Sequence, residues 1–198
     1  MKRFSRAELA AFAGKPVDDL LGDKVCLLIV GINPGLWTAA VNAHFARPGN
    51  RFWPALHVAG ITPHRIDSSE GMGPADAELL RLVGIGITNL SPVATARADE
   101  LTREQLREGA ARLTALVERL QPRVVAVLGV SAYRLAFGLP ATKVGPQPHR
   151  LAGCELWVLP NPSGLNAHFT LPTLAQWYGR AADAAGVPRD RPDSGADS

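Results

Sequence analysis

The feature that most constrains the fold is an alternation of short uncharged segments with amphipathic ones. The uncharged segments are predicted strands, and they are Val25–Val30, Gly84–Leu90, Val124–Leu128 and Leu156–Leu159. A strand without charged positions is typical of a parallel sheet that is buried on both faces. The sequence therefore predicts an α/β protein, a three-layer α/β/α sandwich with a central, mainly parallel sheet.

Capping boxes mark the starts of two predicted helices. Ser5–Glu8 opens a short helix that runs to about Ala13, and Thr102–Gln105 opens a helix over Arg103–Leu120 with apolar residues at helical spacing. Further helices are predicted at Phe52–Ala59, at Ala75–Val83, from a Ser131 cap to Phe137, and from Pro172 to about Ala185.

Two loops leave from the carboxyl ends of predicted strands. Ile32–Arg51 is rich in glycine, proline and asparagine, and we predict a long loop there; loops of that length inside a domain are usually functional. The other loop follows Leu159. In parallel sheets ligands bind beyond the carboxyl ends of the strands, so these loops are the predicted site.

Length and composition limit the possible functions. The 198 residues suit a single domain, which we place at residues 1–187; residues 188–198 have no apolar cluster and are predicted to be disordered. The formal charge of +3 permits a polyanionic partner without demanding one. Two cysteines and five unpaired histidines supply neither a disulfide framework nor a metal site. No signal peptide or membrane-length apolar stretch is present, and we expect a cytoplasmic monomer without cofactor.

Neither of the two loop motifs is decisive by itself. Gly31–Gly35 fits a tight turn capped by Asn33, and it lacks the lysine of a P-loop and the third glycine of a dinucleotide fingerprint. Asn161–Asn166 fits an Asx turn, yet Leu165 is an apolar residue in a loop that should be exposed. An exposed leucine between small polar residues can serve as a wedge between bases.

Four motifs follow one another along the chain: Gly-Ile-Asn-Pro-Gly-Leu at 31–36, Arg-Pro-Gly-Asn-Arg-Phe-Trp at 47–53, Gly-Ile-Gly-Ile-Thr-Asn-Leu at 84–90, and Asn-Pro-Ser-Gly-Leu-Asn at 161–166. Their order and spacing, over roughly Val25 to Tyr178, resemble the Mug/thymine-DNA-glycosylase family of mismatch-specific uracil-DNA glycosylases. The resemblance implies base excision repair of double-stranded DNA by a monofunctional enzyme that flips uracil, chiefly opposite guanine, and hydrolyses its glycosidic bond.

The resemblance also implies roles for individual residues. Asn33 corresponds to the catalytic asparagine that positions the attacking water, and Ile32, His44, Phe45 and Asn89 would surround the flipped base, with Phe45 stacking on it and Asn89 reading its edge. An amide orients water but is no strong base, which suits a path in which the base departs first.

Gly164, Leu165 and Asn166 correspond to the wedge and to contacts with the opposite base, although some family members have arginine near Asn166. The chain also lacks the carboxylate that some relatives carry in the segment at 91–94. Candidates for phosphate contacts are Arg47, Arg51, Lys143 and Arg150.

Structural and functional alternatives stay open at this point. Phe45 would also serve as a core anchor of its loop, and Asn89 as a buried cap at the end of its strand. A glycosylase of broader range, for thymine, hypoxanthine or ethenocytosine, and a binder of mismatched or abasic DNA without catalysis fit the same motifs.

Overall fold

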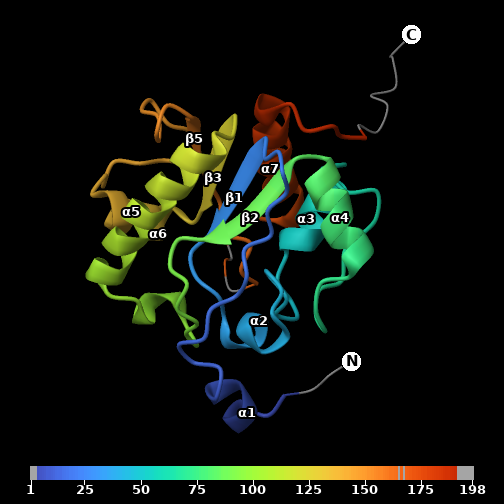
Figure 1. The fold of residues 1–198 in the computed structure, drawn as a ribbon, viewed down its shortest axis with the longest axis vertical. Coiled ribbons are helices and arrows are strands. Elements are labelled where there is room, and N and C mark those ends of the chain that lie inside the picture. The colour runs from blue at the N-terminus through green and yellow to red at the C-terminus, as the bar shows by residue number, and fades with distance from the viewer. Residues whose placement is uncertain (1–3, 165, 167, 191–198) are drawn as a thin grey trace.

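A five-stranded sheet forms the centre of the computed structural model, which describes residues 4–164, 166 and 168–190 (Figure 1). The strands are β1 (Leu27–Gly31), β2 (Ile85–Asn89), β3 (Val124–Leu128), β4 (Gly145–Pro146) and β5 (Glu155–Leu159), in the order β2-β1-β3-β5-β4. All neighbours pair in parallel except β4, which is antiparallel to β5. The predicted mainly parallel sheet is confirmed.

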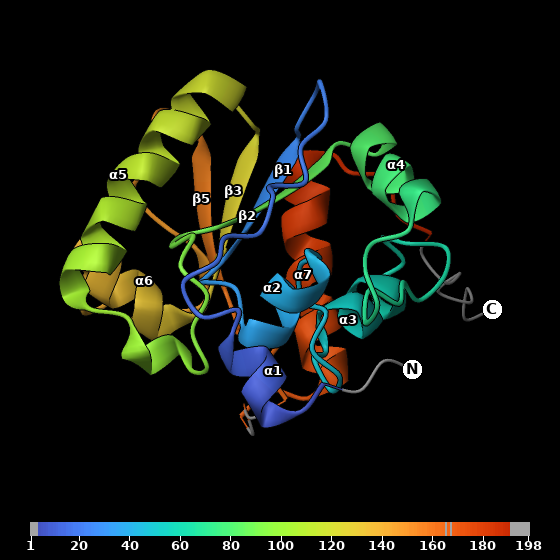
Figure 2. The ribbon, with the colours of Figure 1, turned by 60° about the horizontal axis from the view of Figure 1, so that its bottom comes forward.

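Helices cover both faces of this sheet (Figure 2). One face carries α5 (Arg103–Leu120) and α6 (Val130–Phe137); the other carries α3 (Phe52–Val58), α4 (Pro74–Leu82) and α7 (Leu171–Ala185). Alternate residues of β1 enter different cores: Leu27 and Ile29 pack in one apolar cluster, and Leu28 and Val30 in the other. The central strands β1 and β3 carry no polar side chain because both of their faces are buried.

The short helices α1 (Arg6–Ala10) and α2 (Leu36–Val41) lie together at the carboxyl edge of the sheet. The Ser5 capping box of α1 is present, as is the Thr102 capping box of α5. The prediction of an unbroken loop over Ile32–Arg51 was wrong, because α2 lies within it. Six residues between Gly35 and Asn42 are too few for a recognisable helical period.

Two smaller corrections concern the other edge of the sheet. Helix α6 begins two residues earlier than predicted, with Gly129 at the N-cap in place of Ser131. Gly129 has φ of +105°, a conformation that glycine adopts readily. The strand β4 was missed because two residues carry no alternation, and its pairing with β5 is visible only in three dimensions.

The beginning of the segment predicted to be disordered packs against the domain. Arg189 donates to the Ala59 carbonyl at 2.8 Å and pairs with Asp183, and the Asp190 amide donates to the Gly60 carbonyl. Residues 191–198, the rest of that prediction, lie outside the described residues. Within the described ranges, every helix is too short or too polar to cross a membrane.

Candidate functional site

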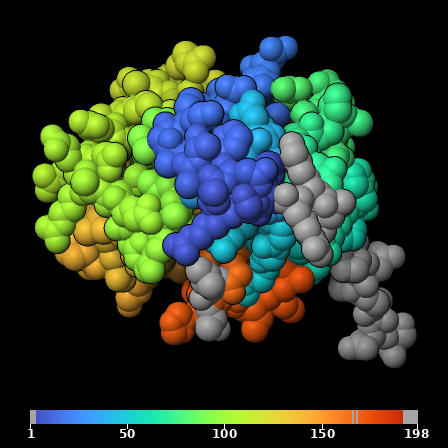
Figure 3. Space-filling model, turned by 90° about the horizontal axis from the view of Figure 1, so that it is seen from below, coloured from blue at the N-terminus to red at the C-terminus, as the bar shows by residue number. Residues whose placement is uncertain are grey.

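A cavity of about 590 Å³ opens at the carboxyl edge of the sheet. Its walls come from the segments that follow β1, β2 and β5 and from the loop between α2 and α3. Figure 3 views this side of the molecule, where the N-terminal residues lie between the segment near residue 100 and the residues that follow α2. Of the predicted site residues, the cavity is lined by Ile32, Asn33, Phe45 and Asn89.

The segment after β2 runs beside the segment after β1 and extends their parallel pairing. The Leu90 amide donates to the Gly31 carbonyl at 2.7 Å, the Ser91 amide to the Ile32 carbonyl at 2.9 Å, and the Thr95 amide to the Pro34 carbonyl at 3.2 Å. Strand pairing thus carries Thr95 to the side of Asn33, although the two residues are far apart in sequence.

The nitrogen of the Asn33 side chain is held by three oxygens. It donates to the Thr95 hydroxyl at 2.7 Å and to the carbonyls of Val93 at 2.9 Å and Pro34 at 3.1 Å. A carbonyl oxygen only accepts hydrogen bonds, so this environment fixes which end of the amide is the nitrogen. The Asn33 Oδ1 atom has no hydrogen-bond partner among the described residues and remains an acceptor for a ligand in the cavity.

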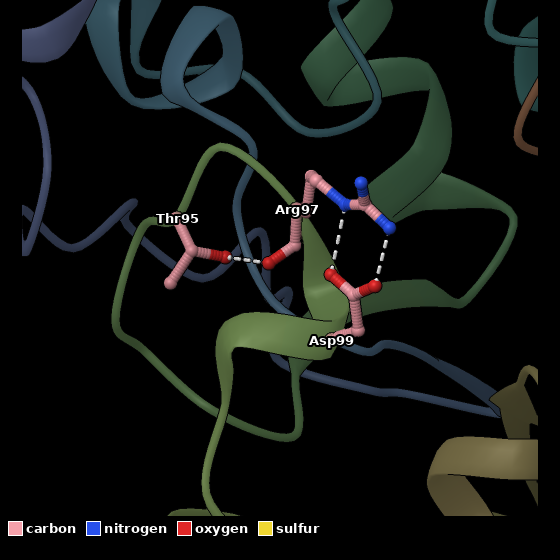
Figure 4. Close-up of polar contacts among 3 residues, drawn as sticks. All are labelled: Thr95, Arg97 and Asp99. Carbon is pink, nitrogen blue, oxygen red and sulfur yellow. Dashed lines mark hydrogen bonds and ion pairs between the residues drawn. The ribbon is translucent and has the colours of Figure 1, made fainter.

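Thr95 is itself held in one orientation (Figure 4). Its hydroxyl donates to the Arg97 carbonyl at 2.6 Å, so the oxygen lone pairs are left for the Asn33 amide. The Arg97 guanidinium meets Asp99 in a two-bond ion pair at the mouth of the cavity. Each of these two charges favours the ionised form of the other: the pKa of Arg97 is raised and that of Asp99 is lowered, mainly by their hydrogen bonds.

Phe45 presents its ring to the cavity from a strained backbone position. Its φ is +55°, which is uncommon for a bulky residue and costs free energy that the surrounding packing must offset. The ring stacks on Phe52 with centroids 3.9 Å apart. A methyl group on Gly31 would come 3.4 Å from the Phe45 ring and 2.5 Å from Asn89 Oδ1, so any larger residue at this position would displace the Asn89 amide.

His44 lies behind Asn89 and does not line the cavity. Its side chain is buried, with Nε2 3.0 Å from the Asp18 carbonyl and Nδ1 3.4 Å from Asn89 Nδ2. Burial lowers the pKa of His44 to about 4, against the opposing effect of Asp19 and of the Asp18 carbonyl, so the ring is neutral at pH 7. Both ring nitrogens of His44 are thus next to protein groups, and the predicted contact between His44 and a base stays a prediction.

The loop after β5 is tied to the loop before α3 by one arginine. Arg51 donates to the carbonyls of Phe169 at 2.5 Å and of Ser163 and Asn166 at 2.7 Å. The terminal nitrogens of Arg51 are therefore occupied within the protein, and its predicted contact with phosphate stays a prediction. Arg47 is exposed and lines the cavity, whereas Lys143 and Arg150 are exposed away from it.

The predicted wedge is described only in part. Gly164 is exposed and approaches the Gly49 carbonyl closely, whereas Leu165 lies outside the described residues. The Asn166 side chain donates to the Asn161 carbonyl at 2.9 Å and accepts from the His168 amide at 3.2 Å. Both ends of the Asn166 amide therefore organise the loop.

Sequence reasoning missed Thr95, Asn161 and Arg97 as residues of the cavity. Thr95 and Arg97 belong to an irregular segment, and the available signal was its place after the carboxyl end of a strand. Asn161 follows β5 directly, and its Oδ1 accepts from the Ser163 amide at 3.0 Å. Among the described residues, no group of three or more histidine, cysteine, aspartate or glutamate side chains is placed to hold a metal ion.

The chain that forms this cavity is similar to proteins of a known family. The model of the Uracil DNA glycosylase superfamily matches residues 19–182, which include the segments after β1, β2 and β5. A solution structure of a candidate uracil DNA glycosylase from Methanosarcina acetivorans is similar in fold, with a TM-score of 0.59 and 19% sequence identity. The match covers 86% of this chain and 98% of that one.

Proposed function

Since the chain belongs to the uracil DNA glycosylase superfamily, and is therefore a DNA glycosylase that hydrolyses N-glycosyl bonds, we propose that it removes uracil from double-stranded DNA, chiefly opposite guanine. The product would be an abasic site. The observation that carries the proposal is the side-chain amide of Asn33, a residue that lines the cavity: its nitrogen is held by Thr95 and two carbonyls, and its oxygen has no hydrogen-bond partner among the described residues.

The proposed reaction follows from the chemistry of that amide. Asn33 Oδ1 accepts a hydrogen bond from water and so orients the water oxygen toward the sugar, but an amide is too weak a base to remove the proton early. The bond between the sugar C1′ and uracil N1 therefore breaks first, and its electron pair leaves with the base. The water oxygen then bonds to C1′ of the oxocarbenium-like sugar and loses a proton to solvent.

The walls of the cavity suit a pyrimidine that has been turned out of the helix. The Phe45 ring would offer an apolar face for stacking, and Asn89 Oδ1, which lies beside Gly31, would accept a hydrogen bond from uracil N3–H. Gly164, Leu165 and Asn166 would form the wedge, with Leu165 filling the place of the extruded base, and the Arg51 contacts with Ser163 and Asn166 support this part of the proposal.

An end-labelled duplex with one uracil opposite guanine tests the proposal. Alkali and heat break the strand only where an abasic site has formed, so wild-type protein should give one product of defined length. Asn33→Ala should lower the single-turnover rate by about 100-fold or more while the Kd for the duplex stays within about threefold. If the wild-type protein binds the duplex but the strand stays intact after alkali and heat, the proposed activity is contradicted.

The choice of base and of its partner is tested separately. The same label is placed opposite adenine and in single-stranded DNA, and uracil is replaced by thymine, hypoxanthine or ethenocytosine. We expect the fastest excision from the guanine–uracil pair. Equal rates opposite guanine and adenine would contradict the mismatch preference but not uracil excision.

A further inference from the structure

His44 is a buried, neutral side chain whose two ring nitrogens are both engaged. Only 3% of the residue is exposed, and it lies on the far side of Asn89 from the cavity. A buried histidine loses the solvation of its charged form, so its hydrogen bonds must suit the neutral ring. The arrangement of those bonds determines which nitrogen carries the proton.

The Asp18 carbonyl fixes the tautomer of His44. A carbonyl only accepts, so the ring nitrogen 3.0 Å from it, Nε2, carries the hydrogen. Asp18 is held in turn by Asn42, which accepts from the Asp18 amide at 3.0 Å and donates to the Asp18 carboxylate at 2.7 Å. With its one proton on Nε2, the neutral ring presents a lone pair at Nδ1.

That lone pair faces the Asn89 amide. The Asn89 nitrogen lies 3.4 Å from His44 Nδ1 and is the donor, and Asn89 Oδ1 is therefore turned toward Gly31 and the cavity. Within the described part of the chain, the Asn89 amide has no other side-chain hydrogen bond. The reversed amide would place its oxygen against the Nδ1 lone pair.

We propose that His44 is a positioning residue that sets the choice of uracil over cytosine, because it holds Asn89 with its oxygen toward the base. This inference rests on the proposed function. Uracil carries a hydrogen on N3 and matches an acceptor, whereas cytosine N3 is an acceptor and matches only the reversed amide. His44 thus penalises cytosine without contacting either base.

Two variants of nearly equal shape separate this role from packing. His44→Asn carries an acceptor close to the position of Nδ1, and His44→Leu has no acceptor there. The probes are duplexes with 5-fluorouracil or 5-fluorocytosine opposite guanine, since fluorine makes both bases better leaving groups and both rates measurable. His57→Leu is the matched control, because His57 is exposed and, among the described residues, its ring bonds only to the Thr62 carbonyl.

In His44→Leu, the single-turnover rate for 5-fluorocytosine should rise about tenfold relative to wild type, while that for 5-fluorouracil falls less than about threefold. His44→Asn and His57→Leu should keep the wild-type ratio of the two rates. A gain of activity on one base is a result that structural damage does not produce.

The background Asn89→Ala identifies the residue through which His44 acts. In that background His44→Leu should leave the ratio unchanged. An unchanged ratio in His44→Leu alone, or the same shift in His44→Asn, would overturn the inference. If wild-type protein excises neither base, the proposed function fails instead, so the two failures are distinguishable.

Discussion

At the residue scale, polar side chains around the cavity are oriented by backbone carbonyls, which accept hydrogen bonds and cannot donate them. The carbonyls of Val93 and Pro34 hold the nitrogen of Asn33, and the Asp18 carbonyl fixes the proton of His44. Because a backbone carbonyl cannot donate, each contact removes one of two possible orientations of an amide or an imidazole. The hydrogen-bonding pattern offered to a ligand is therefore set before the ligand arrives.

Thr95 is the neighbour of Asn33 whose change is most informative. Thr95→Val keeps the shape but removes the oxygen that accepts from Asn33 Nδ2 at 2.7 Å, so the amide loses the shortest of its three hydrogen bonds and is held only by the carbonyls of Val93 and Pro34. We expect the single-turnover rate of uracil excision to fall by about 10- to 100-fold, with the Kd for DNA nearly unchanged.

Thr95→Ser keeps the hydroxyl and should retain the rate within about threefold. A rate that falls equally in both variants would mean that the methyl group, and not the hydrogen bond, is what matters at this position.

At the element scale, the loops that form the site are fixed by hydrogen bonds to one another. The segment after β2 pairs with the segment after β1, and Arg51 joins the start of α3 to the loop after β5 through three carbonyls. Leaving those carbonyls without a donor would cost about 1 kcal/mol or more each where they are buried. Arg51 thus belongs to the framework, whereas exposed Arg47 remains a candidate for contact with DNA.

Salt titration distinguishes these two roles. Arg47→Ala should reduce the slope of log Kd against log salt concentration by about one, because one phosphate contact is lost. Arg51→Gln removes the charge; it should leave that slope unchanged and should lower the thermal stability, since one glutamine amide cannot donate to all three carbonyls. A reduced slope in Arg51→Gln would show that Arg51 meets phosphate.

At the scale of the whole molecule, the buried ring of His44 couples stability to pH. Its pKa is about 4 in the folded protein, against 6.5 for an unperturbed histidine, and burial is the main cause. Between these values the unfolded chain binds more protons than the folded one. The stability contributed by the neutral ring is therefore complete above pH 6.5 and is lost as pH falls from 6.5 to 4.

Urea unfolding of wild type and His44→Leu at several pH values measures this contribution. The difference in unfolding free energy between the two proteins should fall by roughly 3 kcal/mol from pH 7 to pH 4, since one pKa unit corresponds to about 1.4 kcal/mol. The comparison cancels the titration of groups common to both proteins. A difference that stays constant with pH would mean that His44 titrates near its ordinary value.

The sequence by itself determined the α/β class, the exact bounds of α5 and β3, and the candidate residues Asn33, Phe45 and Asn89. Uncharged strands, capping boxes and short motifs each depend only on residues that are close together in the sequence, so they can be identified without the folded structure.

Only the tertiary structure decided what surrounds those residues. Thr95 reaches Asn33 through strand pairing, His44 turns away from the cavity to hold Asn89, and Arg51 bonds to carbonyls more than 100 residues away. Sequence patterns do not predict such partners. A hydrogen bond between segments far apart in the chain forms only after the folded sheet has brought those segments together at one edge.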